Sequence, residues 1–135
     1  MRFFADSSAW IAIFDMDDKY HVQAKDWMAS LEGQGERFVT TDYILDETIT
    51  HLLNTVNHAT AENFALWVLK QKQVQVIHIT EELWHESLKL FNRYDDKDFS
   101  FTDCTSFVIM RRENLRDAFT FDHHFEQMGF RLWPR

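Results

Sequence analysis

Short apolar runs alternate with helical patterns along the whole chain, and this alternation constrains the fold more than any other feature. The runs that favour strands are residues 2–6, 37–41, 74–79, 117–122 and 130–133. Helix-start signals or helical spacing mark residues 7–14, 24–31, 45–56, 61–72, 81–91 and 102–114, with a short helical turn at 123–129. Strands that alternate with helices form a parallel sheet with helices on both faces. The sequence therefore predicts a three-layer α/β/α fold with a mainly parallel central sheet of about five strands.

The composition limits the number of domains and the cellular setting. The chain has 135 residues, a common size for one domain, and its 3 glycines and 1 proline leave little room for flexible linkers. We predict a single domain over residues 1–135. The one cysteine, Cys104, cannot form an intrachain disulfide, and no run is apolar enough to span a bilayer. We expect a cytoplasmic protein without membrane contact.

Three acids are predicted at one edge of the sheet. Asp6 ends the first predicted strand, Asp122 ends the fourth, and Asp103 begins the helix that leads into the fourth. Ligands of open parallel sheets bind outside the carboxyl ends of the strands. Each acid alone has a structural explanation, because Ser100 and Asp103 fit a helix capping box and strand-end turns favour aspartate. Their predicted convergence indicates a site.

The chemistry of that site follows from charge. Three neighbouring carboxylates repel one another, and a hard divalent cation such as Mg²⁺ removes the repulsion by binding their oxygens. A bound cation of this kind activates water and stabilises charge on a phosphoryl group, which suits phosphodiester hydrolysis. The net charge of −8 argues against a protein that coats nucleic acid but is compatible with such an enzyme. Glu47 lies away from the apolar stripe of its helix, and periodicity favours a solvated position for it.

Four motifs, FFADSSAWIAIF, VTTDYILDET, SFTDCTSFVIMRRE and AFTFDHHFEQMGF, resemble those of the PIN-domain ribonucleases, and most of all the VapC-type toxins of toxin–antitoxin pairs. The resemblance covers nearly the whole chain. It implies a PIN-like fold and an endoribonuclease that hydrolyses RNA phosphodiester bonds with Mg²⁺ or Mn²⁺. It also implies a homodimer and a VapB-like antitoxin whose tail enters the acidic groove.

The resemblance assigns residues as well. The catalytic acids that it implies are Asp6, Glu47, Asp103 and Asp122. Of these, the metal would be held by Asp6, Asp103 and Asp122. Ser8 and Thr120 would orient carboxylates or water from just behind the ligands.

Some residues near these motifs need their own interpretation. Asp46 lies beside Glu47 and leaves the register of that ligand open, and Asp98 adds an acid that we place on a surface loop. Cys104 is expected to be a small buried side chain. His123 and His124 are adjacent and should point apart, so we expect surface positions for both. A local basic rim for RNA is predicted from Arg111, Arg112, Arg116 and Arg131.

Two other function classes share this kind of fold: a phosphoacceptor receiver domain and a non-catalytic binding module. A phosphoacceptor receiver domain needs an aspartate at the end of the third strand and a lysine after the last one. Here the third predicted strand ends in HIT and the last is followed by Pro134, so both features are missing. A non-catalytic binding module on the same fold would not need the complete set of acids.

Overall fold

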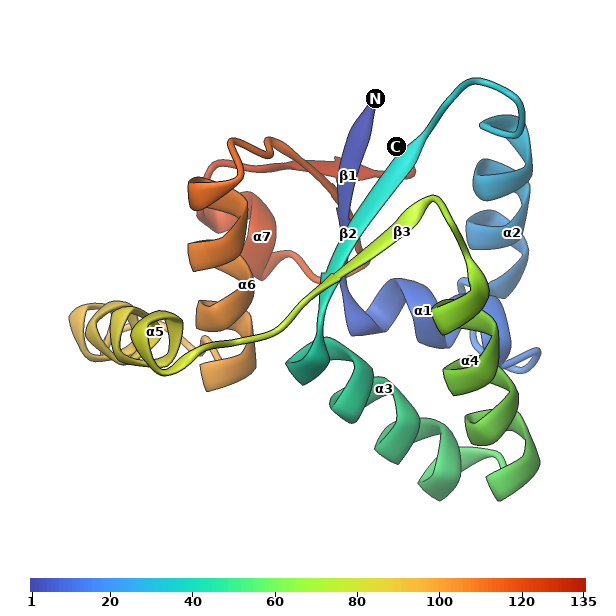
Figure 1. Ribbon diagram of the computed structural model, residues 1–135, viewed down its shortest axis with the longest axis horizontal. Helices are drawn as coiled ribbons and strands as arrows, with labels where there is room; N and C mark the ends of the chain where they lie inside the picture. The colour runs from blue at the N-terminus through green and yellow to red at the C-terminus, as the bar shows by residue number, and fades with distance from the viewer.

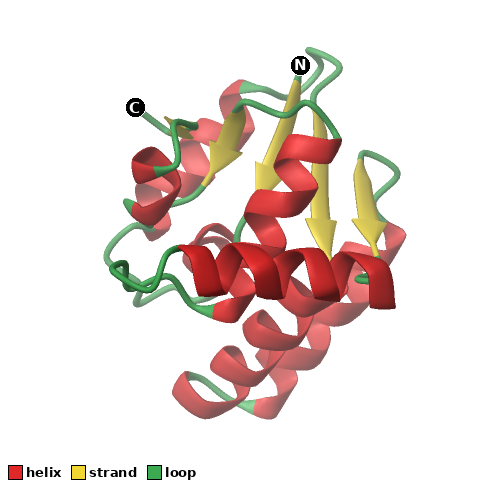
Figure 2. Cartoon of the chain, turned by 90° about the vertical axis from the view of Figure 1, so that its left-hand side faces the viewer, coloured by secondary structure: helices red, strands yellow, loops and turns green.

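The computed structural model describes residues 1–135 and has a five-stranded sheet at its centre (Figure 1). The strands are β1 (Arg2–Ala5), β2 (Arg37–Thr41), β3 (Val74–Ile77), β4 (Asp117–Phe119) and β5 (Arg131–Trp133). Their spatial order is β3-β2-β1-β4-β5, and every neighbouring pair is parallel. The strands therefore all point to the same edge of the sheet, as their arrowheads show in Figure 2. The predicted α/β class is confirmed.

Seven helices surround this sheet. They are α1 (Ser7–Phe14), α2 (His21–Ser30), α3 (Asp42–Thr55), α4 (His58–Lys70), α5 (Glu81–Arg93), α6 (Phe101–Arg112) and α7 (His124–Gln127). In Figure 1, α5, α6 and α7 lie to the left of the sheet, whereas α1, α2 and α4 lie to its right. The helices thus cover both faces, which confirms the three-layer arrangement. No helix is both long and apolar enough to cross a membrane.

The central strands are short and strongly apolar because both of their faces are covered. In β1, Phe3, Phe4 and Ala5 are buried, and all three residues of β4 are buried as well. Phe4 pairs with Val39 of β2, and Ala5 pairs with Phe119 of β4. This register places the ends of β1, β2 and β4 side by side, and the residues that follow these ends share one rim.

Three of the predicted strands end earlier than expected, with consequences for the site. The first ends at Ala5 instead of residue 6, the third at Ile77 instead of residue 79, and the fourth at Phe119 instead of residue 122. After Phe119, the Thr120 hydroxyl accepts the Asp122 N–H at 3.0 Å and bends the chain into a turn. Asp122 therefore lies on a turn between β4 and α7, where its side chain is partly exposed.

Candidate active site

Asp6 directly follows β1 and occupies the N-cap position of α1, so its place is set by the junction of strand and helix. The side chain is 3% exposed. One carboxylate oxygen, Oδ2, accepts hydrogen bonds from the hydroxyls of Ser8 and Thr120, each at 2.9 Å. Ser8 Oγ in turn accepts the N–H of Phe121 at 2.9 Å. Asp6 is thus held by Ser8 of α1 and by Thr120 of the turn after β4.

Asp103 lies in the first turn of α6 and completes the capping box predicted there. The Asp103 N–H donates to Ser100 Oγ, and the Ser100 N–H donates to Asp103 Oδ2, both at 3.0 Å. The box fixes the carboxylate at the helix start instead of letting it turn into solvent. Oδ2 also lies 3.2 Å from Nδ1 of His124. The structural and the functional explanation of Asp103 therefore describe one and the same arrangement.

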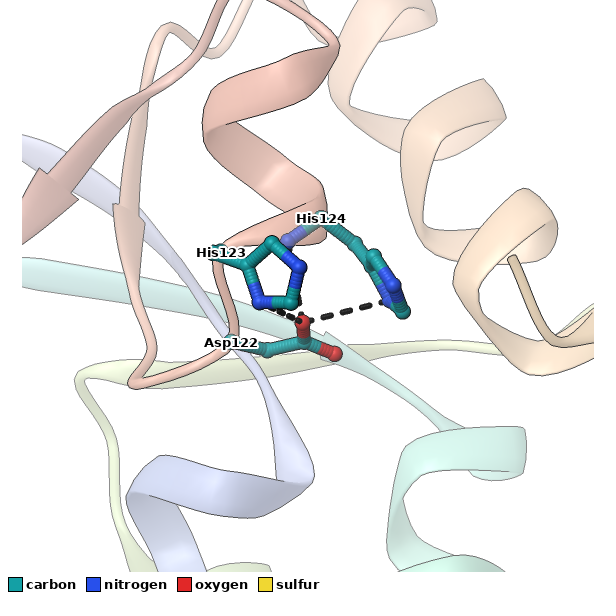
Figure 3. A group of neighbouring side chains, drawn as sticks. All are labelled: Asp122, His123 and His124. Carbon is teal, nitrogen blue, oxygen red and sulfur yellow. Dashed lines mark hydrogen bonds and ion pairs between the residues drawn. The ribbon is translucent and has the colours of Figure 1, made fainter. Parts of the chain in front are cut away.

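Asp122 is ordered by the turn in which it lies. Its Oδ1 accepts the N–H of His124 at 2.9 Å, which is an Asx turn, and the same oxygen is 3.2 Å from His124 Nδ1. In Figure 3 the dashed contacts from both histidines reach one oxygen of this carboxylate. The other oxygen has no hydrogen-bond partner within the protein.

Glu47 reaches the site from α3 through a contact that periodicity does not reveal. The hydroxyl of Ser7 in α1 donates to Glu47 Oε1. The residue as a whole is exposed, as its position on the helix predicts, yet its carboxylate is partly shielded from water and lies within electrostatic reach of Asp103 and Asp122. The solvated-face interpretation is therefore right for the residue as a whole and wrong for its carboxylate.

These four carboxylates, Asp6, Glu47, Asp103 and Asp122, are called the acid cluster below. Each member has one oxygen bound by protein donors: Asp6 Oδ2, Glu47 Oε1, Asp103 Oδ2 and Asp122 Oδ1. The second oxygen of every member is free of protein hydrogen bonds. Free oxygens on oriented carboxylates are the donors that Mg²⁺ and Mn²⁺ prefer. The acid cluster thus fits a hard divalent cation.

Burial and mutual repulsion raise the pKa values of three acids of the cluster. Burial is the largest cause that raises the pKa of Asp6 to about 7, and repulsion from Asp103 and Glu47 adds to it, against the bonds from Thr120 and Ser8. Burial also raises the pKa of Asp103 and of Glu47, with the repulsion of neighbouring acids as a further cause. A bound cation would remove much of this penalty.

Several other predicted residues can be placed. Asp46 and Asp98 are both exposed, and neither makes a hydrogen bond to the acid cluster. The side chain of His123 is 74% exposed, as expected. The surface position expected for His124 is wrong, because its side chain is 19% exposed and contacts two acids of the cluster. The expectation that the two side chains point apart is also wrong, because their ring centroids are 4.6 Å apart. An Asx turn sets the direction of His124, whereas the prediction assumed regular helix geometry.

The predicted basic rim is also wrong. Arg111 and Arg112 end α6, at the opposite end of the helix from Asp103, and Arg112 pairs with Glu82 and Glu86 of α5. Arg116 precedes β4 and Arg131 begins β5, so both lie at the amino edge of the sheet, away from the acid cluster. The prediction failed because it did not consider at which end of its strand or helix each arginine lies.

The comparison with protein families decides how this arrangement should be classified. The family model described as the PIN domain matches residues 3–131 of the chain. The chain belongs to the PIN-domain family. The match includes all four residues of the acid cluster, so the site lies within the part of the chain that defines the family.

Named relatives of this PIN domain are similar along most of its length. The 23S rRNA-specific endonuclease VapC20 of Mycobacterium tuberculosis is 32% identical over 127 residues, which are 94% of each chain. A VapC ribonuclease of Archaeoglobus fulgidus is 26% identical over 113 residues, covering 82% of this chain and 71% of the relative.

Solved structures agree with this PIN-domain fold. The crystal structure of Mycobacterium tuberculosis VapC20, described as a sarcin-ricin loop cleaving toxin, superposes with a TM-score of 0.87, at 32% identity and 95% coverage of each chain. VapBC2 from Rickettsia felis has a TM-score of 0.69 at 10% identity, with 98% of this chain and 97% of that chain covered, and supports the fold alone.

Two residues of this PIN domain were not assigned to the site from the sequence. The hydroxyl of Ser7 donates to Glu47, and no local sequence pattern predicts a contact between α1 and α3. His124 had a usable signal, because an aspartate two residues before it favours an Asx turn that brings the two side chains together.

Proposed function

We propose that this PIN domain is a divalent-metal-dependent endoribonuclease and the toxin of a VapBC-type toxin–antitoxin pair. The observation that carries the proposal is the acid cluster, in which four carboxylates each keep one oxygen bound by the protein and the other one open. Relatives named as VapC ribonucleases support the reaction class. RNA is therefore the proposed substrate and its phosphodiester bond the reacting group.

Each acid of the cluster has a proposed role. Asp6, Asp103 and Asp122 hold Mg²⁺ or Mn²⁺, which supplies charge stabilisation at the phosphoryl group and acidifies water. Ser8 and Thr120 hold Asp6 Oδ2 and leave Oδ1 free for the cation. Glu47 orients the attacking water with its free oxygen, and burial raises the pKa of its carboxylate, which makes it a stronger proton acceptor.

The relatives narrow the substrate and the partners to be tested first. The similarity to a 23S rRNA-specific endonuclease covers 94% of both chains, and ribosomal RNA is accordingly our first candidate substrate. We propose a VapB-like antitoxin as the inhibitor, a homodimer as the assembled form and the cytoplasm as the location. We also propose that residues 1–135 fold as one domain, because 26 buried residues form one apolar core.

A cleavage assay tests the reaction. Purified protein is incubated with total cellular RNA and with isolated ribosomes in Mg²⁺ or Mn²⁺, and the products are mapped by primer extension. Wild-type protein should cut RNA, whereas excess EDTA or the substitution Asp103→Asn should abolish cutting with the fold retained by circular dichroism. Asp98→Asn, an exposed acid outside the cluster, is the matched control and should cut normally. Full activity of Asp103→Asn would refute the assignment.

A calorimetric titration separates the enzyme from a non-catalytic module. Wild-type protein should bind Mn²⁺, and Asp6→Asn should bind it at least about tenfold more weakly because one ligand oxygen is replaced by an amide. An absence of Mg²⁺ and Mn²⁺ binding in wild-type protein would favour the module. Co-expression with the protein encoded next to this chain tests the antitoxin, which should form a stable complex and suppress cleavage.

A further inference from the structure

His124 is the only residue whose side chain contacts the carboxylates of two acids of the cluster. Its Nδ1 lies 3.2 Å from Asp103 Oδ2 and 3.2 Å from Asp122 Oδ1. Asp103 belongs to α6 and Asp122 to the turn after β4, so this imidazole joins two separate segments of the site. No other hydrogen bond connects the side chains of these two acids.

The direction of both contacts follows from the partners of the two oxygens. Asp103 Oδ2 already accepts the N–H of Ser100, and Asp122 Oδ1 already accepts the backbone N–H of His124. Both oxygens are therefore acceptors, and an acceptor nitrogen between them would be repelled. Nδ1 therefore carries a hydrogen, which it donates to Asp103 Oδ2. Asp122 Oδ1 lies at the same distance from this nitrogen and makes an electrostatic contact with the N–H group.

The imidazole is also fixed in its orientation. The ring of Phe99 meets it edge to face, with 5.4 Å between ring centroids and an interplanar angle of 79°. Phe99 is itself buried, with 5% of its surface exposed, so its packed ring restricts the orientation of the imidazole. The neighbouring His123 is exposed and has no contact with Asp103; its ring centroid is 4.6 Å from that of His124, and its Nδ1 is 3.9 Å from Asp122 Oδ1, too far for a hydrogen bond. The contrast makes His123 a matched control for His124.

We infer that His124 is a positioning residue that couples Asp103 to Asp122, and this inference rests on the proposed function of the same site. Its N–H donates to Asp103 Oδ2 and contacts Asp122 Oδ1, and so leaves Asp103 Oδ1 and Asp122 Oδ2 for the cation. Without that N–H, each carboxylate keeps one backbone donor and can rotate independently of the other. Partners that orient metal ligands in this way typically change metal affinity by about 10–100-fold.

A direct metal ligand is the competing role for His124. Asp122, His123 and His124 place one potential ligand atom each within 4.8 Å of one another, which is compatible with a transition-metal site (Figure 3). Direct binding through Nδ1 would require loss of the hydrogen that this nitrogen donates to Asp103 Oδ2. The two roles therefore differ in whether nitrogen is bound to the metal.

Mn²⁺ binding by His124 variants tests the inference, with affinities from calorimetry and the coordination of the ion from pulsed electron paramagnetic resonance. His124→Ala should weaken Mn²⁺ binding by about tenfold or more. His124→Asn should recover most of the affinity, because its amide N–H can replace Nδ1–H. His123→Ala should bind as wild type does. The wild-type spectrum should lack the ¹⁴N coupling of a directly bound imidazole.

The outcomes separate this inference from the proposed function. If wild-type protein binds no Mn²⁺, the proposed function fails and the inference fails with it. If wild-type protein binds Mn²⁺ and His124→Ala binds it equally well, only the inference fails. Imidazole coupling in the spectrum, or an asparagine variant as weak as alanine, would also overturn it. Should the alanine variant unfold, His124→Leu fills the space beside Phe99 without a donor and should show the same loss.

Discussion

Thr120 Oγ1 donates a 2.9 Å hydrogen bond to Asp6 Oδ2, although 114 residues separate them in the chain. The same oxygen atom of Thr120 accepts the N–H of Asp122 at 3.0 Å. One buried hydroxyl thus orders two acids of the cluster, one through its side chain and one through its backbone. The ends of β1 and β4 are coupled chemically at the point where the parallel register brings them together.

Replacing this hydroxyl should damage both stability and metal binding. Thr120→Val keeps the shape of the side chain but leaves the Asp122 N–H without its acceptor. The Asp6 carboxylate then keeps only the hydrogen bond from Ser8. We expect a loss of about 1–3 kcal/mol in the free energy of unfolding. Mn²⁺ affinity should fall by roughly tenfold or more, measured by calorimetry.

A threonine away from the acid cluster provides the control for this substitution. Thr48 is buried in α3, and its hydroxyl donates only to the Ile44 carbonyl of the same helix, at 2.7 Å. Thr48→Val should therefore lower stability and leave Mn²⁺ affinity nearly unchanged. Equal Mn²⁺ affinity in wild type and Thr120→Val would show that the link between Thr120 and Asp6 does not shape the site.

The acidity of Asp6 predicts how the metal-free protein responds to pH. Its pKa is about 7 in the folded protein and 3.8 ordinarily, so the unfolded chain loses this proton first as the pH rises. The contribution of Asp6 to stability is complete below the ordinary pKa and is lost as the pH rises through about 7. In EDTA, the melting temperature should therefore fall between about pH 4 and pH 8.

Asp6→Asn isolates this effect because the amide carries no charge at any pH. In EDTA near pH 8 the variant should melt several degrees above wild type, roughly as expected for a gain of a few kcal/mol, and the difference should shrink toward pH 4. Saturating Mn²⁺ should reverse the order by stabilising wild type alone. A variant that melts below wild type in EDTA at every pH would contradict the prediction.

The sequence was most informative where local pattern and topology coincide. Strand–helix alternation yields the parallel sheet, and its polarity then places Asp6, Asp103 and Asp122 on one rim. Glu47 could not be assigned in this way, because periodicity relates a side chain to its own helix, whereas its partner Ser7 belongs to another. His124 was misplaced for a related reason, since a turn and not a regular helix sets its direction.

The contact between Ser7 and Glu47 should be visible in the pH dependence of cleavage. The hydrogen bond from Ser7 lowers the pKa of Glu47 against the effect of burial, so its removal should raise that pKa further. Ser7→Ala should move the acid limb of the profile of kcat against pH to higher pH and reduce kcat by about tenfold near neutral pH. Ser106→Ala removes a buried hydroxyl that bonds only Thr102 within α6, and its profile should match wild type. An unchanged profile in Ser7→Ala would exclude a role for this contact.

Cys104 follows Asp103 and gives a chemical probe of the helix that carries this acid. The thiol is buried, and burial, with the charge of Asp103 as a further cause, raises its pKa to about 11. Because the thiolate is the reactive form, native protein should react with Ellman's reagent only as fast as it unfolds, whereas denatured protein should react at once. Mn²⁺ should slow the reaction further, because a ligand that binds only the folded state reduces unfolding.

A different result would reveal local opening at the start of α6: the thiol would react faster than the whole protein unfolds, and Mn²⁺ would suppress this fast reaction. Since Asp103 lies on that turn, such opening would mean that the acid cluster is assembled by the metal and not held ready by the fold.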